Sequence, residues 1–354
     1  MKQALSIDGK PVLRLRSGLE IRVGDVWAGI ALIVAAIVFS GFSINIGVTQ
    51  TGFVDLLETV IGGQLGDDQT YTLWNIRFPR ILLGFMAGWC VAITGAMLQS
   101  LARNPLADPG LFGLSQGAMA VIMLLLVFLP NAPRSLIPLA AMIGGLGVAF
   151  LLIWLTGGSH ANGLALLLMG IAVETVLSSI TSILLLYTPP DTSYAVSSWL
   201  AGSLYQASWS GIVALAPWCV LSLPAIFLIG RALRSYDLGA EMAMSLGEQV
   251  SRSRPIILFV AVLLSSAAVT AVGPLMFLGV MAPHLAGFMS QATGRSRLVL
   301  SGLMGGVLVV GADCLTRGLA GNLAIPIGLS LTIIGVPLFI ISLRLKALKD
   351  MRTE

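Results

Sequence analysis

The chain alternates between long apolar runs and short breaks that are charged or rich in proline and glycine. Ten of the runs are about 20 residues long, the length of helix that crosses a hydrocarbon core about 30 Å thick. The pattern therefore predicts ten transmembrane helices, at 26–46, 81–100, 111–129, 135–156, 163–187, 211–230, 255–273, 274–290, 298–320 and 326–345. Only Gly273 and Pro274 separate the seventh run from the eighth, and we keep the two apart because 255–290 is too long for one crossing.

The composition also indicates a membrane protein. Apolar residues make up 56% of the 354 residues and charged residues 10%, against about 25% charged residues in soluble domains. We expect an all-α polytopic bundle, with a cytoplasmic N-terminal segment at 1–25, a single transmembrane domain at 26–346 and a cytoplasmic tail at 347–354. The first apolar run has no small-residue cleavage site, so we expect a first span and no cleaved signal peptide.

The distribution of positive charge predicts the orientation. When both termini are placed in the cytoplasm, sixteen of the twenty Lys and Arg residues fall on cytoplasmic segments, as the positive-inside rule requires. The four on the outside are Arg77, Arg80, Arg134 and Arg317. An odd number of spans would place the basic tail outside. The orientation of the chain in the membrane thus accounts for the net charge of +4, and we expect no nucleic-acid partner.

One inside loop, 231–254, is long enough to hold structure. Asp237 can cap a short helix there and Gly247 can end it, while Leu238 and Met242 share one face. A short amphipathic helix of this kind is too weak to stand alone, so we expect it to dock to a partner.

Catalytic and metal-binding patterns are sparse. His160 and His284 have no second ligand at the spacing of a metal pair, and the three cysteines lie in separate apolar runs, so we interpret all five as structural. No G-x-x-x-x-G-K-[ST] loop occurs. We expect neither an enzyme nor a metal site, and any ATP that drives transport must bind to another subunit.

Two features place charge inside predicted spans. Asp313 and Arg317 are four residues apart with the acid first, which suits either a local ion pair or an interaction with a partner. Glu174 lies in the middle of the fifth span without a cation near it in sequence. Charge in the membrane is costly. Glu174 is therefore either a hydrogen-bonded packing residue or the coupling acid of a proton-driven carrier.

Several ordered motifs occur between about Arg77 and Leu343. They are RFPRIL (77–82), GAMLQSL (95–101), NPLADPG (104–110), WLAGS (199–203), AMSLG (243–247), GPLMFLG (273–279), APH (282–284), ADCLTR (312–317) and IPIG (325–328). Together they resemble the permease subunit of the iron-siderophore and vitamin B12 class of ABC importers, often called the FecCD family.

The resemblance implies a type II ABC importer permease fold of ten helices, with two such subunits around a central pathway in the bacterial inner membrane. The implied partners are a second permease chain, two cytoplasmic ATPase subunits and a periplasmic binding protein that delivers a ferric siderophore, haem or corrinoid. ATP and magnesium would belong to the ATPase, and this chain would bind no cofactor. Transport would proceed by alternating access.

The resemblance also assigns roles to residues. The ATPase-coupling segment would comprise Asp237, Leu238, Glu241, Met242, Ser245, Leu246 and Gly247. Docking cations for the binding protein would be Arg77, Arg80 and Arg317, and anchoring at the membrane interface is the alternative for the first two. Candidate residues of the translocation pathway are Gln99, Asn104, Ser115, Gln116, Ser178 and Thr181.

Two positions depart from the family. Many members carry Arg after Pro-His-x-x and Glu before the IPIG motif, whereas this chain has Gly287 and Ala324. If the two charges cooperate in the family, this chain has lost both of them together. This favours a heterodimer with a different permease over a homodimer.

The leading hypothesis is an importer permease for a ferric siderophore, with vitamin B12 or haem as alternative substrates of the same family. A more distant alternative is an ion-coupled secondary transporter that uses Glu174. A membrane-embedded enzyme acting on lipid would need clustered Asp or His on an inside loop. The inside loops offer only Asp237, Glu241 and Glu248 on one short helix.

Overall fold

The computed structural model describes residues 2–5, 11–14, 20–46, 52, 66–155, 163–188, 193, 196–197, 199–320 and 325–350. Each predicted span corresponds to one helix within these residues. The helices are α1 (Val23–Asn45), α4 (Phe78–Ala102), α5 (Leu114–Phe128), α6 (Ile137–Leu155), α7 (Gly163–Leu186), α9 (Trp209–Tyr236), α11 (Val250–Val272), α12 (Leu278–Met289), α13 (Gly294–Ala320) and α14 (Ile327–Asp350). Eight described helices are long and apolar enough to cross a membrane, and α5 and α12 are shorter apolar helices.

The predicted break between the seventh and eighth spans is confirmed. α11 ends at Val272, and Gly273 follows with a φ of +75°, a backbone conformation that L side chains rarely adopt. A Cβ at this position would also collide with the carbonyl oxygen of Trp199. Glycine is therefore required where the chain turns from α11 into α12.

Shorter elements flank the spans. α3 (Asp67–Tyr71) and the π-helix η1 (Thr72–Arg77) run into α4, so the helix begins well before the predicted start of the second span. Two further short helices in the described part of the chain are η2 (Arg134–Leu136) and α10 (Ala240–Ser245), and the latter occupies the predicted inside loop.

The N-terminal segment holds a small sheet that the sequence analysis does not predict. Its strands are β1 (Lys2–Leu5), β2 (Pro11–Arg14) and β3 (Glu20–Arg22), in the order β1-β2-β3. Both pairings are antiparallel, with Val12 opposite Arg22. The strands are too short to give a clear period-two pattern, which is why they escape detection in the sequence.

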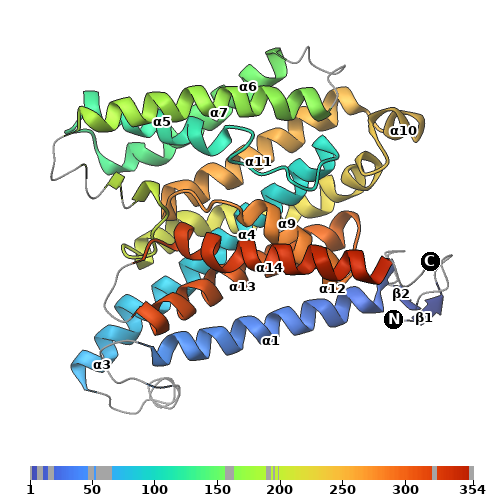
Figure 1. Cartoon of the computed structure of the whole chain (residues 1–354), viewed down its shortest axis with the longest axis horizontal. Helices are drawn as coiled ribbons and strands as arrows, with labels where there is room; N and C mark the ends of the chain where they lie inside the picture. Colours follow the sequence, from blue (N-terminus) through green and yellow to red (C-terminus); the bar gives the residue numbers. More distant parts are fainter. Residues whose placement is uncertain are drawn as a thin grey trace.

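Figure 1 shows the sheet, α10 and the last turns of α14 at one end of the bundle, on the right, and α3 at the other. We call these the α10 end and the α3 end. The first and last spans therefore begin and end on the same side, as an even number of crossings requires.

α4 is the central helix of the bundle. α4 is part of the continuous helix Asp67–Ala102. In the apolar part of this helix 78% of the residues are buried, compared with 28% in the apolar part of α7. It packs against α13, α11, α9 and α12. Close approach depends on small residues, because a Cβ on Gly88 would lie 2.9 Å from the backbone nitrogen of Gly306 on α13.

Candidate functional site

α10 presents an apolar surface at the α10 end of the bundle. Gly239 (φ +109°) precedes the helix, and Gly247 (φ +86°) follows it, so the predicted end at Gly247 is confirmed. Four apolar side chains on and beside the helix are 52% to 61% exposed: Leu238, Met242, Met244 and Leu246. Glu241 and Ser245 are also exposed, and the Ser245 hydroxyl donates to the Glu241 carbonyl at 3.0 Å. So many exposed apolar side chains on one short helix indicate a contact surface.

The prediction that Asp237 caps α10 is wrong. Gly239 occupies the N-cap position, and no side chain caps the helix. Asp237 instead accepts a hydrogen bond from the Ser100 hydroxyl at 2.7 Å and pairs with Arg297 at 3.0 Å. Asp237 stands two residues before the N-cap position, and the Arg297 guanidinium binds its carboxylate in a charge-assisted bond instead. Arg297 is 60 residues away in sequence, so only the fold brings it near.

Asp108 shapes the loop that follows α4. Its Oδ1 atom accepts a hydrogen bond from the backbone N–H of Gly110 at 2.8 Å, a bond that is common for Asp in turns. The side chain is buried against the first turn of α12, where a Cβ on Gly279 would lie 2.6 Å from Asp108 Oδ2. Burial raises the pKa of Asp108 to about 6, and the backbone N–H groups of Gly110, Gly279 and Val280 oppose the rise.

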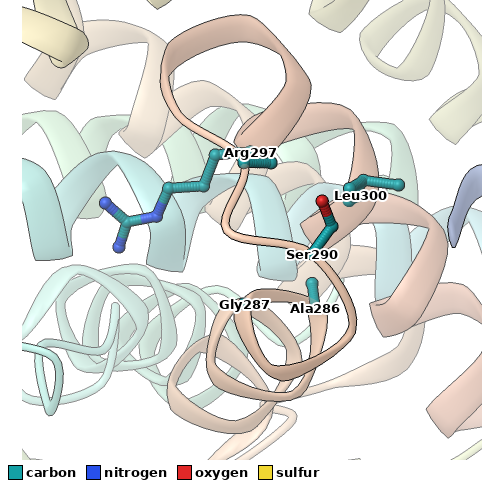
Figure 2. A pocket seen from close by; sticks show the side chains of 6 residues that line it. Ala286, Gly287, Ser290, Arg297 and Leu300 are labelled. Atoms are coloured by element: carbon teal, nitrogen blue, oxygen red, sulfur yellow. The ribbon is translucent and has the colours of Figure 1, made fainter. Parts of the chain in front are cut away.

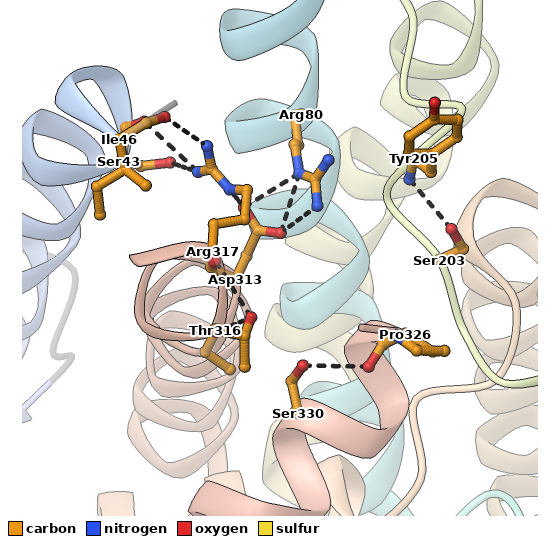
Figure 3. Close-up of polar contacts among 11 residues, drawn as sticks. Ser43, Ile46, Arg80, Ser203, Tyr205, Asp313, Thr316, Arg317, Pro326 and Ser330 are labelled. Carbon is orange, nitrogen blue, oxygen red and sulfur yellow. Dashed lines mark hydrogen bonds and ion pairs between the residues drawn. The ribbon is translucent and has the colours of Figure 1, made fainter. Parts of the chain in front are cut away.

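A cluster of charge at the α3 end contains two of the predicted docking cations (Figure 3). The predicted pair between Asp313 and Arg317 is present, at 2.9 Å. Asp313 also accepts three hydrogen bonds from Arg80 of α4, at 2.7, 2.9 and 3.2 Å. Arg317 further binds the Ser43 hydroxyl and donates to the Ile46 carbonyl at 3.1 Å. One carboxylate thus holds both arginines against α1, α4 and α13.

Arg77, the third predicted docking cation, lies at the same end of the bundle but is buried. It is only 4% exposed, and its guanidinium donates to the carbonyl of Ile44 in the last turn of α1. Together with Arg317 it places positive charge at the C-terminus of α1, where the helix dipole favours it. A docking role for Arg77 would require this contact to open.

The candidate pathway residues do not form one cluster. Gln99 is buried, and its side chain donates to the Gly279 carbonyl at 3.1 Å. The Asn104 side chain accepts a hydrogen bond from the backbone N–H of Leu106 at 2.9 Å and so stabilises the loop after α4. Both residues therefore have clear structural roles at the α10 end.

The other four pathway candidates lie on α5 and α7, which pack against each other. Ser115 Oγ is 3.3 Å from Ser265 Oγ on α11. Gln116 has a buried Oε1 atom without a hydrogen-bond partner among the described residues. On α7, Ser178 is half-buried and Thr181 is buried, with its hydroxyl bonded to the Leu177 carbonyl at 2.9 Å. Their assignment to the pathway stays a prediction.

Gly287 borders two hollows at the α10 end. A cleft of about 810 Å³ separates the N-terminal sheet from α12, and its lining includes Pro11, Arg22, His284 and Gly287. Figure 2 shows a smaller pocket, of about 30 Å³, between Gly287, Ser290 and Leu300. A Cβ on Gly287 would meet no atom within 4 Å. The arginine that many family members carry here would therefore have room, whereas Ala324 lies outside the described residues.

His284 has the structural role that the sequence predicts, because its ring lies 4.6 Å from the Phe339 ring and its Nε2 atom is 2.9 Å from Ser342 Oγ. His160 lies outside the described residues. The cysteines are free, although Cys90 Sγ and Cys219 Sγ lie 3.4 Å apart between α4 and α9. Sequence reasoning missed this pairing, the burial of Asp108 and the contacts of Arg297. For Arg297 the only signal was a second arginine at the start of a predicted span.

Comparison with known proteins agrees with the arrangement of helices. The model of the FecCD transport family matches residues 32–345. The chain is 33% identical to the Fe(3+)-citrate import system permease protein YfmE of Bacillus subtilis (strain 168) over 90% of this chain and 95% of that protein. It is 34% identical to the Fe(3+) dicitrate transport system permease protein FecD of Escherichia coli (strain K12) over 78% and 86% of the two chains.

A solved structure also resembles this one. It is described as an inward-facing conformation of a metal-chelate type ABC transporter, and it superposes with a TM-score of 0.78 at 24% identity. The match covers 89% of this chain and 98% of that chain, so the two share a fold. With its apolar helices and a family match across nearly all of them, the chain is a multi-pass membrane protein that belongs to the FecCD transport family.

Proposed function

We propose that this chain is the membrane-spanning permease subunit of an ABC importer that moves a ferric siderophore or similar iron chelate into the cytoplasm. The observation that carries the proposal is the family match over residues 32–345. The names of several relatives support an iron chelate as substrate, since they include Fe(3+)-citrate, iron(3+)-hydroxamate and hemin permeases. Because one relative is a hemin permease, haem is an alternative substrate. Vitamin B12 is a further alternative substrate.

α10 is the segment that docks to the cytoplasmic ATPase. Its exposed Met242 and Leu246 would fill an apolar groove on that subunit, and burial of such side chains is a main source of affinity at interfaces. This assignment places the α10 end in the cytoplasm. The arginines in the last turns of α9 and in the first turns of α11 and α13 then lie inside, in agreement with the positive-inside rule.

The α3 end faces the binding protein. Arg80 and Arg317 have side chains that are 19% and 21% exposed, whereas that of Asp313 is 5% exposed. The carboxylate therefore lies beneath the two guanidinium groups and keeps them in fixed positions. Acidic side chains of a binding protein can then pair with their remaining donors, which fixes the orientation of docking.

α7 borders the translocation pathway between two permease chains. Its exposed face carries Thr175, Ser179 and Ser182, whose hydroxyls bond to backbone carbonyls of the preceding turn at 2.8 to 2.9 Å. These exposed polar groups support the placement of this face along a water-filled pathway. Alternating access would rearrange this surface as the ATPase subunits approach each other.

The second permease is a different chain in this proposal. Among the relatives, two systems each have two separately named permeases: YfmE with YfmD, and FecC with FecD. The space beside Gly287 supports this assignment, because the partner chain could supply the charge that this chain lacks there.

The first test is purification of the tagged chain from its native membrane in mild detergent, followed by identification of the proteins that accompany it. We expect an ATPase with a phosphate-binding loop and a second, different ten-span permease. Recovery of the chain without an ATPase would contradict the importer, and cross-links between identical chains alone would contradict the heterodimer.

Competition identifies the substrate class. Uptake of radioactive iron as ferric citrate or a ferric siderophore is measured with unlabelled haem or cobalamin in excess. Persistent iron uptake is expected. Suppression by haem or cobalamin would shift the assignment to that substrate.

A further inference from the structure

Two arginines in the first turns of α13 have different partners. Arg295 contacts α9: its Nε atom donates to the Phe227 carbonyl at 2.9 Å, and its guanidinium lies 5.5 Å from the centre of the Phe227 ring. Arg297 extends in another direction, away from Ser290 and Leu300 (Figure 2). The two residues therefore allow the role of one guanidinium to be separated from the general effect of positive charge at this position.

The Arg297 guanidinium joins three parts of the chain. Its Nη1 atom donates to Asp237 Oδ1 and to Ser100 Oγ, each at 3.0 Å, and its Nη2 atom donates to Gln99 Oε1 at 2.9 Å. The Ser100 hydroxyl donates to the same Asp237 oxygen at 2.7 Å and closes the network. We call Gln99, Ser100, Asp237 and Arg297 the Arg297 cluster.

The cluster extends to the first turn of α12. The Gln99 amide that accepts from Arg297 also donates, through its Nε2 atom, to the Gly279 carbonyl at 3.1 Å. α4 and α12 touch directly at this level, because a Cβ on Gly95 would lie within 2.6 Å of the Gly279 carbonyl carbon. A displacement of Gln99 along α4 would therefore shift the start of α12.

Asp237 connects the Arg297 cluster to the coupling segment. It follows α9 directly and stands three residues before the start of α10. The extensive contacts of α10 itself are with α9 and α11. The Arg297 cluster therefore supplies a direct polar connection from the base of α10 to α4, α12 and α13.

We propose that Arg297 is a positioning residue that transmits movement of α10 to α4 and α12 during the transport cycle. The inference rests on the proposed function, in which α10 is moved by an ATPase. Bonds to a charged group are short and directional, and one planar guanidinium holds all three acceptors in a fixed relation. Asp237 cannot move far unless Arg297 and Gln99 follow.

The test uses the whole transporter, with the partners recovered by the purification described above, in proteoliposomes. Three variants are compared with the wild type: Arg297→Gln, Arg297→Lys and the control Arg295→Gln. The readout is the number of iron chelates taken up per ATP hydrolysed, because a residue with a merely structural role would lower uptake and hydrolysis together. Co-purification of the ATPase and the melting temperature of each variant are measured alongside.

Arg297→Gln is expected to retain the ATPase and its hydrolysis while the uptake per ATP falls by about tenfold. Arg297→Lys keeps the charge but lacks the planar fork whose two nitrogens bind the acceptors, so an intermediate ratio is expected, and Arg295→Gln is expected to match the wild type. Equal losses of uptake and hydrolysis in Arg297→Gln, or the same fall in Arg295→Gln, would overturn the inference. If Arg297→Gln fails to assemble, a normal ratio in Arg297→Lys and Asp237→Asn would overturn it too. A wild-type complex without ATP-dependent uptake would instead refute the proposed function.

Discussion

Asp313 of α13 holds Arg80 of α4 through a two-pronged ion pair, in which Arg80 Nη2 and Nε lie 2.7 and 2.9 Å from Asp313 Oδ1. The two residues are 233 positions apart in sequence. Because the same carboxylate also pairs with Arg317, its removal would leave two partly buried cations without their counter-charge.

We therefore predict that Asp313→Asn lowers the free energy of unfolding by about 3 kcal/mol, since removal of one partner of a buried pair leaves uncompensated charge. The measurement is the melting temperature of the purified protein in detergent. Asp68→Asn, on exposed α3, is the matched control and should have the same melting temperature as the wild type. Equal melting of the two variants would show that the cluster does not stabilise the fold.

A second prediction concerns the apolar surface of α10. Leu246→Asp should weaken binding of the ATPase by about tenfold or more, because a charge replaces a side chain that an apolar groove would bury. The stability of the permease should not change, because Leu246 is 61% exposed. Co-purification of the ATPase measures the effect, with Asp68→Asn on exposed α3, at the opposite end of the bundle, as control. Undiminished recovery of the ATPase with Leu246→Asp would assign its docking to another surface.

A third prediction follows from the burial of Asp108. Its pKa is raised from 3.8 to about 6, so the folded protein binds this proton more tightly than the unfolded chain does. The stabilisation is complete below pH 3.8 and is lost as the pH rises through about 6. The loss amounts to about 3 kcal/mol.

Asp108→Asn preserves an acceptor for the Gly110 N–H and cannot ionise. The wild type should therefore lose stability relative to this variant as the pH rises from about 4 to about 7. Thermal unfolding of both proteins across this range measures the difference. A difference that does not vary with pH would mean that Asp108 does not titrate in this range.

The contact between α4 and α13 gives a fourth prediction. In Gly88→Ala the new Cβ would lie 2.7 Å from the Gly305 carbonyl carbon, so the helices must separate, at a cost of about 1 to 3 kcal/mol. Gly147→Ala on α6 is the control, because its Cβ meets nothing within 4 Å. Melting temperatures should fall for Gly88→Ala alone. A similar fall in both variants would point to a general effect of alanine at helical glycines.

Much of the fold follows from local patterns in the sequence. Runs of apolar residues locate the ten helices, and Gly273 with Pro274 marks the break before α12, because these signals depend on neighbours in the chain. The predicted pair between Asp313 and Arg317 succeeds for the same reason, since four residues bring two side chains onto one face of a helix.

The polar contacts of the site are harder to predict from the sequence, because they join segments that are distant along the chain. Local spacing favoured Asp237 as a helix cap, and nothing in the sequence placed Arg297 or Ser100 beside it. The same limit applies to Arg80, which the sequence suggests as a docking cation or an interfacial anchor and which Asp313 binds in the structure. Single-sequence patterns cannot show which helices become neighbours, and these polar clusters depend on that choice.

In the proposed function, an ATPase drives transport through this permease. The most direct test of this proposal is uptake of radioactive ferric citrate or siderophore by proteoliposomes that contain the purified complex, with and without ATP. We expect uptake that requires ATP hydrolysis, persists without an ion gradient and survives Glu174→Gln. Uptake that proceeds without ATP, follows a proton or sodium gradient and disappears with Glu174→Gln would contradict the proposed function and identify a secondary transporter.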